Sequence, residues 1–273
     1  MMRGVCIGDV TPALAQLGAP WCFGVGAIAT NDVMCDAPAE FVPLTFESDP
    51  AVQALNWERF LTWDNYAHNW LVGNEPCGAW DNFKPASEVA AIFVRQMDYV
   101  LGFDADAKFI LTCGTQGQLP HQWHNDNPPL VGELWKNLPK RLRKKISGFH
   151  MHIYPRWVSD DPAIRWDVKY FVRYIKGLQR WLVENGITRK EIWVSEFGFE
   201  GYFADNAEDY ARCVQYVKDL LGNKFLQRNV ARLAFYVASE RTGPDGSNSY
   251  LPLLDPTGNL TALGKIWTGN VSA

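Results

Sequence analysis

The chain has 273 residues, of which 47% are hydrophobic and 21% are charged, and these proportions exclude a largely disordered protein. Its formal net charge of -4 excludes the excess of Lys and Arg that a nucleic-acid-binding surface needs. No apolar run approaches the length of a bilayer-spanning helix, and we expect one domain covering residues 1–273.

The first residues and the number of cysteines give expectations about the cell compartment in which the protein works. The opening MMRGVCIGDV has one Arg and no sustained apolar stretch, so no signal peptide is predicted. The protein is then expected either to stay inside the cell or to be secreted and to have lost its leader. The six cysteines show neither the spacing of a zinc site nor the density of a disulfide scaffold, and most are expected in the core.

Short apolar runs alternate with longer helical patterns from end to end, which is typical of strand–helix units around a parallel sheet. In chain order, the predicted strands are Gly4–Gly8, Trp21–Ala27, Phe41–Phe46, Trp70–Gly73, Lys108–Cys113, Gly148–Tyr154, Ile192–Phe197 and Arg232–Val237. The predicted helices are Ala51–Trp63, Ser87–Leu101 with Ser87 as N-cap, Pro129–Lys145, Ala163–Glu184, Ala207–Leu221 and a closing helix in the tail from Asn259.

Eight such units in a chain of this length indicate a (β/α)8 TIM barrel, whose reactive residues lie at the carboxyl ends of the strands. A doubly wound open sheet is the alternative, but no GxGxxG or Walker sequence supports it. The densest basic run, KRLRKK at Lys140–Lys145, is interpreted as the solvated end of a helix.

Two glutamates follow predicted strands. Glu75 ends the fourth strand, in the sequence WLVGNEP, and Glu196 ends the seventh, in IWVSEFGF. Two carboxylates that flank a glycosidic bond suffice to hydrolyse it, and a separation of about 5 Å predicts retention through a covalent intermediate. Either acid alone could be a loop acid or a helix cap. We expect burial or the charge of Glu196 to raise the pKa of Glu75 and keep it protonated.

Other residues near these strand ends could bind a sugar. Asn74 directly precedes Glu75, and its amide could hold a hydroxyl group beside the reacting carbon. His150, His152 and Tyr154 alternate along the sixth strand and so share a face, from which His152 or Tyr154 could orient the nucleophile or bind the sugar. His150 could instead be a core histidine. The aromatic candidates for sugar stacking are Trp80, Trp123, Trp157, Tyr202 and Tyr236.

A pair of histidines on one strand face could also bind zinc. Barrel metallohydrolases need further His or Asp ligands at other strand ends, whereas His68, His121 and His124 lie in helix or loop patterns. We therefore expect no metal and no cofactor.

The order of the motifs resembles a known family. GNEP after strand four and SEFGF at strand seven resemble the clan A glycoside hydrolases, which are retaining TIM-barrel enzymes. The pieces LGAPWCFGVG, FVPLTF, WLVGNEP, FHMHIYP, IWVSEFG and LLDPTGNLTALGKIW are similar to glycoside hydrolase family 128, related to a fungal alkali-sensitive-linkage protein and typically active on β-1,3-glucans.

The resemblance implies roles for particular residues. Asn74 and Glu75 match the Asn-Glu acid/base pair, and Glu196 matches the nucleophile. Gly73 and Cys77 stand where that pattern often has an aromatic and an acidic residue. Strand eight, RLAFYVAS, lacks the usual subsite Trp, which leaves Phe235 or Tyr236 as candidates for its place.

The sequence therefore predicts a retaining glycoside hydrolase that cleaves a β-linked glucan, with β-1,3-glucan favoured and endo action expected. Its expected partner is an oligo- or polysaccharide substrate, with no nucleic acid and no membrane, and we expect a monomer. One alternative is a noncatalytic carbohydrate-binding barrel that kept the architecture and lost turnover. The other is a metal-dependent hydrolase.

Overall fold

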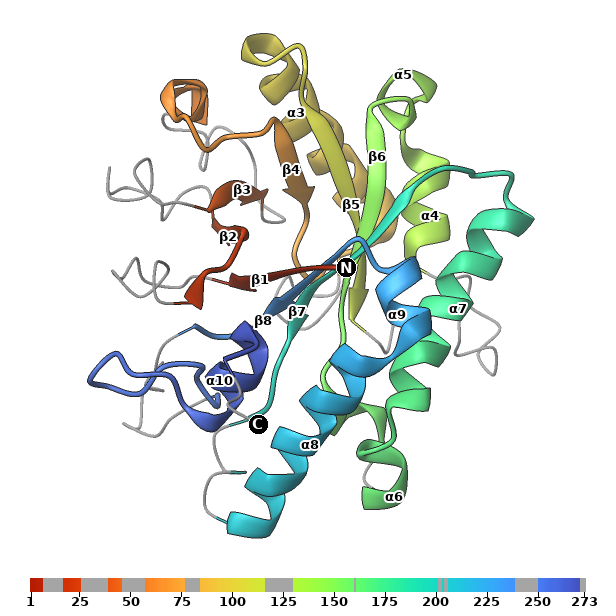
Figure 1. The fold of residues 1–273 in the computed structure, drawn as a ribbon. Coiled ribbons are helices and arrows are strands. Elements are labelled where there is room, and N and C mark those ends of the chain that lie inside the picture. The colour runs from red at the N-terminus through yellow and green to blue at the C-terminus, as the bar shows by residue number, and fades with distance from the viewer. Residues whose placement is uncertain are drawn as a thin grey trace.

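The computed structural model describes residues 1–6, 17–25, 39–45, 57–76, 84–115, 130–159, 161–200, 203, 206–238 and 250–270. Its centre is a closed barrel of eight parallel strands in the order of the chain, and β8 pairs with β1 to close it (Figure 1). The strands are β1 (Met2–Cys6), β2 (Trp21–Val25), β3 (Glu40–Thr45), β4 (Asn69–Val72), β5 (Lys108–Thr115), β6 (Ile146–His152), β7 (Glu191–Phe197) and β8 (Arg232–Phe235).

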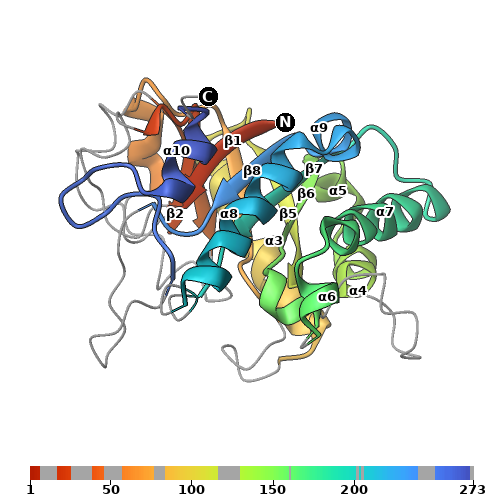
Figure 2. The same ribbon diagram turned by 60° about the horizontal axis from the view of Figure 1, so that its bottom comes forward.

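This is the predicted TIM barrel, and every strand lies at its predicted place with boundaries that differ by one or two residues. The helices that follow the strands run back along the outside of the barrel (Figure 2). They are the 3-10 helix η2 (Trp57–Thr62), α3 (Ala86–Phe103), α4 (Leu130–Asn137), α5 (Lys140–Arg143), the 3-10 helix η5 (Pro155–Val158), α6 (Pro162–Arg165), α7 (Val168–Glu184), α8 (Ala207–Gly222), α9 (Lys224–Asn229) and α10 (Ala262–Thr268).

None of the helices within the described ranges is both long and apolar enough to cross a bilayer.

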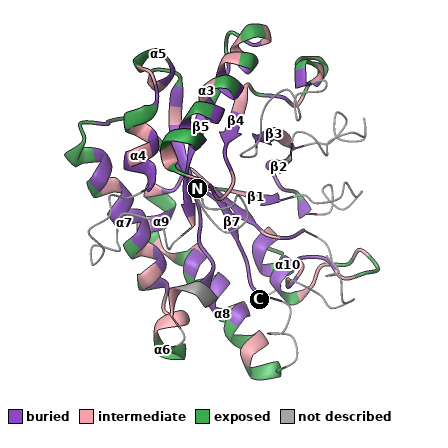
Figure 3. Cartoon of the chain, turned by 180° about the vertical axis from the view of Figure 1, so that it is seen from behind, coloured by how far each residue is buried: buried purple, intermediate pink, exposed green. Residues whose placement is uncertain are grey.

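The hydrophobic residues form two cores. The smaller one fills the inside of the barrel, where Trp21 of β2 packs edge-on against Trp193 of β7 with ring centroids 5.4 Å apart. The guanidinium of Arg232 lies 4.2 Å from the Trp193 ring centroid and is paired with Glu40 at 2.8 Å. The larger core lies between the strands and the helices, whose outer faces are exposed (Figure 3). Packing on both faces explains why the strands are nearly continuous apolar runs.

Prolines and caps divide helices that the apolar pattern predicted as continuous. The predicted helix Pro129–Lys145 is wrong, because Pro139 separates α4 from α5 and has no N–H to continue the helical ladder. The predicted helix Ala163–Glu184 is also divided. The side chain of Asp167 accepts the backbone N–H of Lys169 and begins α7 anew after α6.

Two further helix predictions need correction. Ser87 is not an N-cap, because α3 begins at Ala86 and its N-cap is Pro85, which makes no side-chain cap bond. The described part of the predicted helix Ala51–Trp63 is the 3-10 helix η2, since residues 51–56 lie outside the described ranges. The helices α8 and α10 lie where Ala207–Leu221 and the tail were predicted to be helical.

Candidate active site

The turn after β4 brings Glu75 to the carboxyl end of the barrel. Gly73 has φ +79, a left-handed conformation that favours glycine, and its N–H donates to the Thr45 hydroxyl of β3 at 3.1 Å. The hydroxyl of Thr112 on β5 donates to the carbonyl oxygen of Asn74 at 3.0 Å. The neighbouring strands therefore hold the backbone on both sides of Glu75.

The packing around Gly73 also leaves no room for a side chain at this position. A Cβ at this position would lie 2.3 Å from Cζ of Phe93 and 2.8 Å from Cγ2 of Thr112. An aromatic residue before Asn74, as the resemblance suggested, is incompatible with this packing. Glycine is thus required here both by the backbone conformation and by the space.

We expect Gly73→Ala to lower the free energy of unfolding by about 2–4 kcal/mol, because left-handed strain and overpacking add. Gly186→Ala is the matched control, since Gly186 has φ +66 but nothing lies within 4 Å of its Cβ position. That control should lose about 1–2 kcal/mol from strain alone. Chemical denaturation measures both variants. Equal losses would show that contact with Phe93 has no energetic weight.

A bulge in β7 determines which of its side chains reach the barrel interior. Trp193 packs inside the barrel, whereas Phe197 contacts Trp267 of α10 on the outside, although residues four apart share a face in a regular strand. The pairing register with β8 shifts between Val194 and Phe197, as an extra residue in β7 requires. The side chains of two consecutive residues of β7, rather than of one, can therefore point into the barrel.

Those two residues, Ser195 and Glu196, meet the alternating side chains of β6 and the segment that follows it. The Ser195 hydroxyl lies 2.8 Å from Nδ1 of His150, and the Tyr154 hydroxyl donates to Oε2 of Glu196 at 2.5 Å. Their four side chains are buried. His150 and Tyr154 share the face that their spacing predicted.

The centre of the site is a histidine between two carboxylates. Nδ1 of His152 lies 2.8 Å from Oε1 of Glu75 and 3.3 Å from Oε2 of Glu196. One atom of each of these three side chains lies within 4.8 Å of the other two. The His152 side chain is fully buried, whereas 21% of the Glu75 side chain and 11% of the Glu196 side chain are exposed. Both glutamate side chains thus keep some contact with solvent, whereas the histidine has none.

The electrostatics of Glu75 correct the sequence-based expectation. Burial raises the pKa of Glu75, but the hydrogen bond and the positive charge of His152 together lower it by more than burial raises it. The net pKa of Glu75 is therefore below the ordinary value. The prediction that the surroundings of Glu75 raise its pKa is therefore wrong for the unliganded site. Reasoning from two carboxylates alone omitted the imidazole between them.

Burial also shifts the pKa values of Tyr154 and His150. It raises the pKa of Tyr154 well above its ordinary value, together with the negative charge of Glu196, so this phenol stays a hydrogen-bond donor. Burial and then the charge of His152 lower the pKa of His150 to about 3, so His150 is neutral at neutral pH. His150 therefore packs as a neutral partner of Ser195 inside the barrel.

The same three side chains, Glu75, His152 and Glu196, are the described residues that could hold a metal ion. Two carboxylate oxygens and an imidazole nitrogen are ordinary ligands for divalent ions. Binding through Nδ1 of His152 would require that atom to give up its hydrogen bond to Glu75. The ligand set is thus possible but competes with the network just described.

Of the aromatic candidates, Tyr236 is the one whose side chain the structure describes. Trp80, Trp123 and Tyr202 lie outside the described residues, as does Cys77, and for Trp157 only the backbone, within η5, is described. Tyr236 packs partly against the inner core, and its ring centroid lies 6.3 Å from that of Tyr154.

Phe235 points the other way from Tyr236. Its ring centroid lies 5.4 Å from that of Trp267, in the layer between strands and helices. Tyr236, and not Phe235, therefore faces the candidate site from β8. Gly198 permits this arrangement, because a Cβ there would lie 2.1 Å from the carbonyl oxygen of Tyr236.

Sequence reasoning missed Tyr250. Its ring centroid lies 4.7 Å from that of Tyr236 and 5.9 Å from that of Tyr154, so the three rings form one cluster beside Glu196. Residue 250 also forms an antiparallel bridge with Glu200, four residues after Glu196. The only signal in the sequence was an aromatic residue just before the LPLLDP motif.

The chain is similar to known proteins over nearly its whole length. A protein-family model described as glycosyl hydrolase catalytic core matches residues 21–267. No curated protein sequence matches the chain. Several solved structures are similar in fold.

One similar structure is a family 128 (subgroup I) endo-β-1,3-glucanase variant from Amycolatopsis mediterranei in complex with laminaripentaose, with 14% identity, 98% of each chain covered and a TM-score of 0.63. Another is a subgroup II endo-β-1,3-glucanase from Pseudomonas viridiflava, with 20% identity, 98% of this chain and 96% of that chain covered and a TM-score of 0.62. A subgroup VII oligosaccharide-binding protein from Trichoderma gamsii has 14% identity, coverage of 98% and 92%, and a TM-score of 0.60.

Proposed function

Because the chain belongs to the glycosyl hydrolase catalytic core family and is a glycoside hydrolase, we propose that it cleaves β-1,3-glucan with retention of configuration. Glu75 is the acid/base and Glu196 is the nucleophile. The observation that carries the proposal is the meeting of these two side chains, from the turn after β4 and from β7, with carboxylate oxygens within 4.8 Å. Retaining enzymes have carboxyl groups about 5–5.5 Å apart, whereas inverting enzymes leave room for a water molecule.

In the first step, Glu196 attacks the anomeric carbon and Glu75 gives its proton to the departing glycosidic oxygen. The bond from the carbon to that oxygen breaks as the ester bond to Glu196 forms. Tyr154 holds Oε2 of Glu196 at 2.5 Å and keeps the carboxylate oriented. In the second step, Glu75 takes a proton from water, which attacks the same carbon and releases Glu196.

His152 sets the protonation of Glu75 before the first step. Its Nδ1 atom is within reach of both carboxylates, at 2.8 Å and 3.3 Å. When a sugar covers the site and the N–H turns toward Glu196, Glu75 loses the interaction that lowers its pKa while its burial increases. Glu75 then becomes protonated, because His152 stabilises a negative charge on Glu196 more than one on Glu75.

The substrate class is supported by two arguments of different kind. The similar structures from Amycolatopsis mediterranei and Pseudomonas viridiflava are described as endo-β-1,3-glucanases. In this chain, the cluster of Tyr154, Tyr236 and Tyr250 places aromatic surface beside Glu196, and such surface stacks on the apolar face of a pyranose ring. Asn74 supplies an amide next to Glu75.

The test is hydrolysis of a panel containing laminarin, cellulose, xylan and chitin, read by reducing ends, product length and the anomeric configuration of the fresh product. We expect laminarin to give β-anomeric oligosaccharides of several lengths, as an endo-acting retaining enzyme should. Release of α-anomers would refute retention. Calorimetric binding of laminari-oligosaccharides with no reducing ends from any glycan would instead assign a noncatalytic binding role, as described for the Trichoderma gamsii structure.

The same assay decides the metal alternative. Strong chelation should leave turnover unchanged if Glu75, His152 and Glu196 act through hydrogen bonds. Elemental analysis then checks that no metal remains in the protein. Loss of activity that a divalent ion restores would assign these three side chains to a metal site instead.

We expect His152→Gln to move the alkaline limb of the kcat/KM profile to higher pH. The substitution removes the positive charge that helps to lower the pKa of Glu75 and leaves the burial that raises it. His68→Gln is the control, because the half-buried His68 pairs with Asp104 outside the site and its replacement should leave the profile unchanged. A shift of the limb to lower pH in His152→Gln would show that His152 does not lower the pKa of Glu75.

A further inference from the structure

One face of α7 carries a row of cations that no linear run of the sequence reveals. Lys169, Arg173, Lys176 and Arg180 are spaced by four, three and four residues, which places them on one side of the helix. All four are exposed, and the row extends about 16 Å along the helix axis. It stands out in a chain whose formal net charge is -4.

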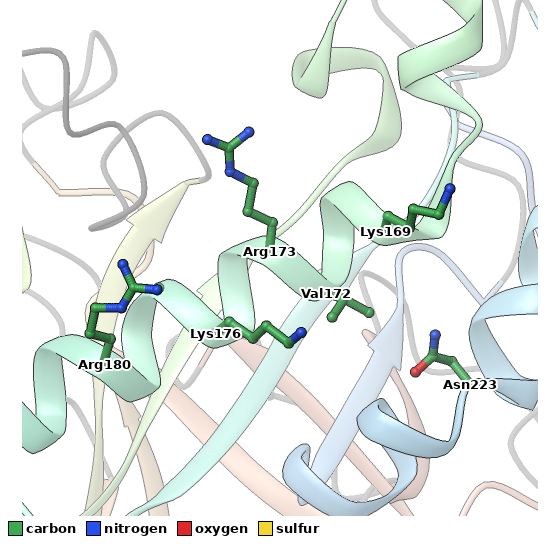
Figure 4. Close-up of a pocket in the computed structure, with 7 residues that line it drawn as sticks. Lys169, Val172, Arg173, Lys176, Arg180 and Asn223 are labelled. Carbon is green, nitrogen blue, oxygen red and sulfur yellow. The ribbon is translucent and has the colours of Figure 1, made fainter.

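These cations border a groove of about 470 Å³ between α7 and the start of α9 (Figure 4). Arg173 and Arg180 project to one side of α7, while Lys176 and Val172 lie toward Asn223. The described residues that line the groove include no acidic side chain. The groove is therefore positive along its length.

Most of the charge in the groove is available to a ligand. Lys169 pairs with Asp167 at 3.2 Å, but its side chain is 89% exposed. Among the described residues, Arg173, Lys176 and Arg180 form no ion pair, and the ammonium of Lys176 lies 5.1 Å from the ring centroid of Phe225. Exposed cations of this kind favour binding of a polyanion more than they stabilise the fold.

The neutral parts of the groove indicate which polyanion fits. Oδ1 of Asn223 accepts the N–H groups of Phe225 and Leu226 at 3.0 and 3.2 Å, so its Nδ2 amide is directed to other acceptors. Val172 and Gly177 give a small apolar floor. An amide donor, an apolar floor and a row of cations match the hydroxyl groups, ring faces and carboxylates of an acidic sugar chain.

A nucleic acid fits less well. The described residues that line the groove include no aromatic side chain on which a base could stack. The family to which the chain belongs also acts on carbohydrate.

We propose that the α7 groove is a second carbohydrate site, which binds a carboxylated polysaccharide away from the barrel mouth. Lys169 lies in the first turn of α7, at the end of the helix nearest the carboxyl ends of the strands. A chain bound along α7 therefore leads toward the catalytic end of the barrel. The proposal depends on the groove and not on the reaction assigned to Glu75 and Glu196.

The test is calorimetric binding of the whole protein to polygalacturonate at low salt, with laminarin, dextran sulfate (a sulfated glucan without carboxylates) and a DNA duplex as comparison ligands. We expect polygalacturonate to bind, and its affinity to fall as salt is added. Arg173→Glu/Arg180→Glu should weaken it about tenfold or more, because two attractions become repulsions. Lys144→Glu/Lys265→Glu makes the same change in net charge at exposed residues outside the groove and should bind normally.

Both variants should hydrolyse a short laminari-oligosaccharide as the parent protein does, and the unfolding temperature checks their folding. If the double Glu variant unfolds, Arg173→Ala/Arg180→Ala removes the charges without repulsion and should still weaken binding several-fold. Failure of polygalacturonate to bind, equal loss in the Lys144→Glu/Lys265→Glu control, or tighter binding of dextran sulfate or DNA would overturn the proposal. The outcomes that would overturn the proposal are all binding measurements, so they are independent of the hydrolysis assay that tests the proposed function.

Discussion

Replacing Glu196 with Gln should lower kcat on β-1,3-glucan by about 10⁴-fold or more, because the amide cannot attack the anomeric carbon. The hydrogen bond from Tyr154 has an acceptor oxygen in the amide as well, so the fold and sugar binding should persist. Steady-state hydrolysis measures the loss, and calorimetry with a laminari-oligosaccharide measures the binding. Full activity in this variant would end the assignment of Glu196.

Chemical rescue separates a nucleophile from a residue that only shapes the site. In Glu196→Ala, azide can occupy the space of the carboxylate and attack from the same face, which gives an α-glycosyl azide. In Glu75→Ala, azide should instead attack the intermediate in place of water and give the β-azide. The reverse pattern would exchange the two roles.

Replacing Glu75 with Gln should have an effect that depends on the leaving group. Hydrolysis of β-1,3-glucan should fall by about 10²–10⁴-fold, because the departing sugar hydroxyl needs a proton. An aryl β-laminaribioside with a dinitrophenolate leaving group needs no proton, so its glycosylation step should be nearly unaffected. Pre-steady-state release of the phenolate measures that step directly.

The matched control is Asn74→Ala, which removes the neighbouring amide but keeps the acid. Its losses on glucan and on the aryl glycoside should be similar, because the role proposed for Asn74 is to bind sugar and an amide does not transfer a proton. If Glu75→Gln slowed both substrates equally, Glu75 would be a binding residue and the proton donor would lie elsewhere.

The barrel could be predicted from the sequence because its strands are buried on both faces and stand out as apolar runs. Helix boundaries were less predictable, because they depend on local caps and breaks. Pro139 divides one predicted helix, and Asp167 begins α7 by accepting the N–H of Lys169. Hydrophobic periodicity does not register either event.

The meeting of Glu75 and Glu196 follows from strand order, since the carboxyl ends of parallel strands gather at one end of a barrel. The exact surroundings of these two glutamates do not follow from strand order. The bulge in β7 directs both Ser195 and Glu196 inward, and a simple alternation of side chains would not. The lowered pKa of Glu75 depends on the 2.8 Å approach of His152 on β6, a strand that does not pair with β4. Only the three-dimensional structure of the barrel shows this approach.

Residues far along the chain were the hardest to place. Tyr250 joins Tyr154 and Tyr236 only because the segment after β8 returns to bridge Glu200. The cations of α7 were likewise overlooked in favour of the linear run Lys140–Lys145. In the structure, Arg141 of that run pairs with Asp98, and Arg143 donates to the Leu138 carbonyl.

The most direct test of the central claim is to trap the covalent intermediate. A 2-deoxy-2-fluoro-β-laminaribiosyl fluoride should glycosylate the nucleophile and then react slowly with water, because fluorine at C2 destabilises both transition states while fluoride leaves readily. Mass spectrometry of the intact protein and of its peptides should find one fluorosugar on Glu196, and none in Glu196→Gln. A label on Glu75, or hydrolysis of the fluoride with inversion and no adduct, would contradict the retaining mechanism proposed here.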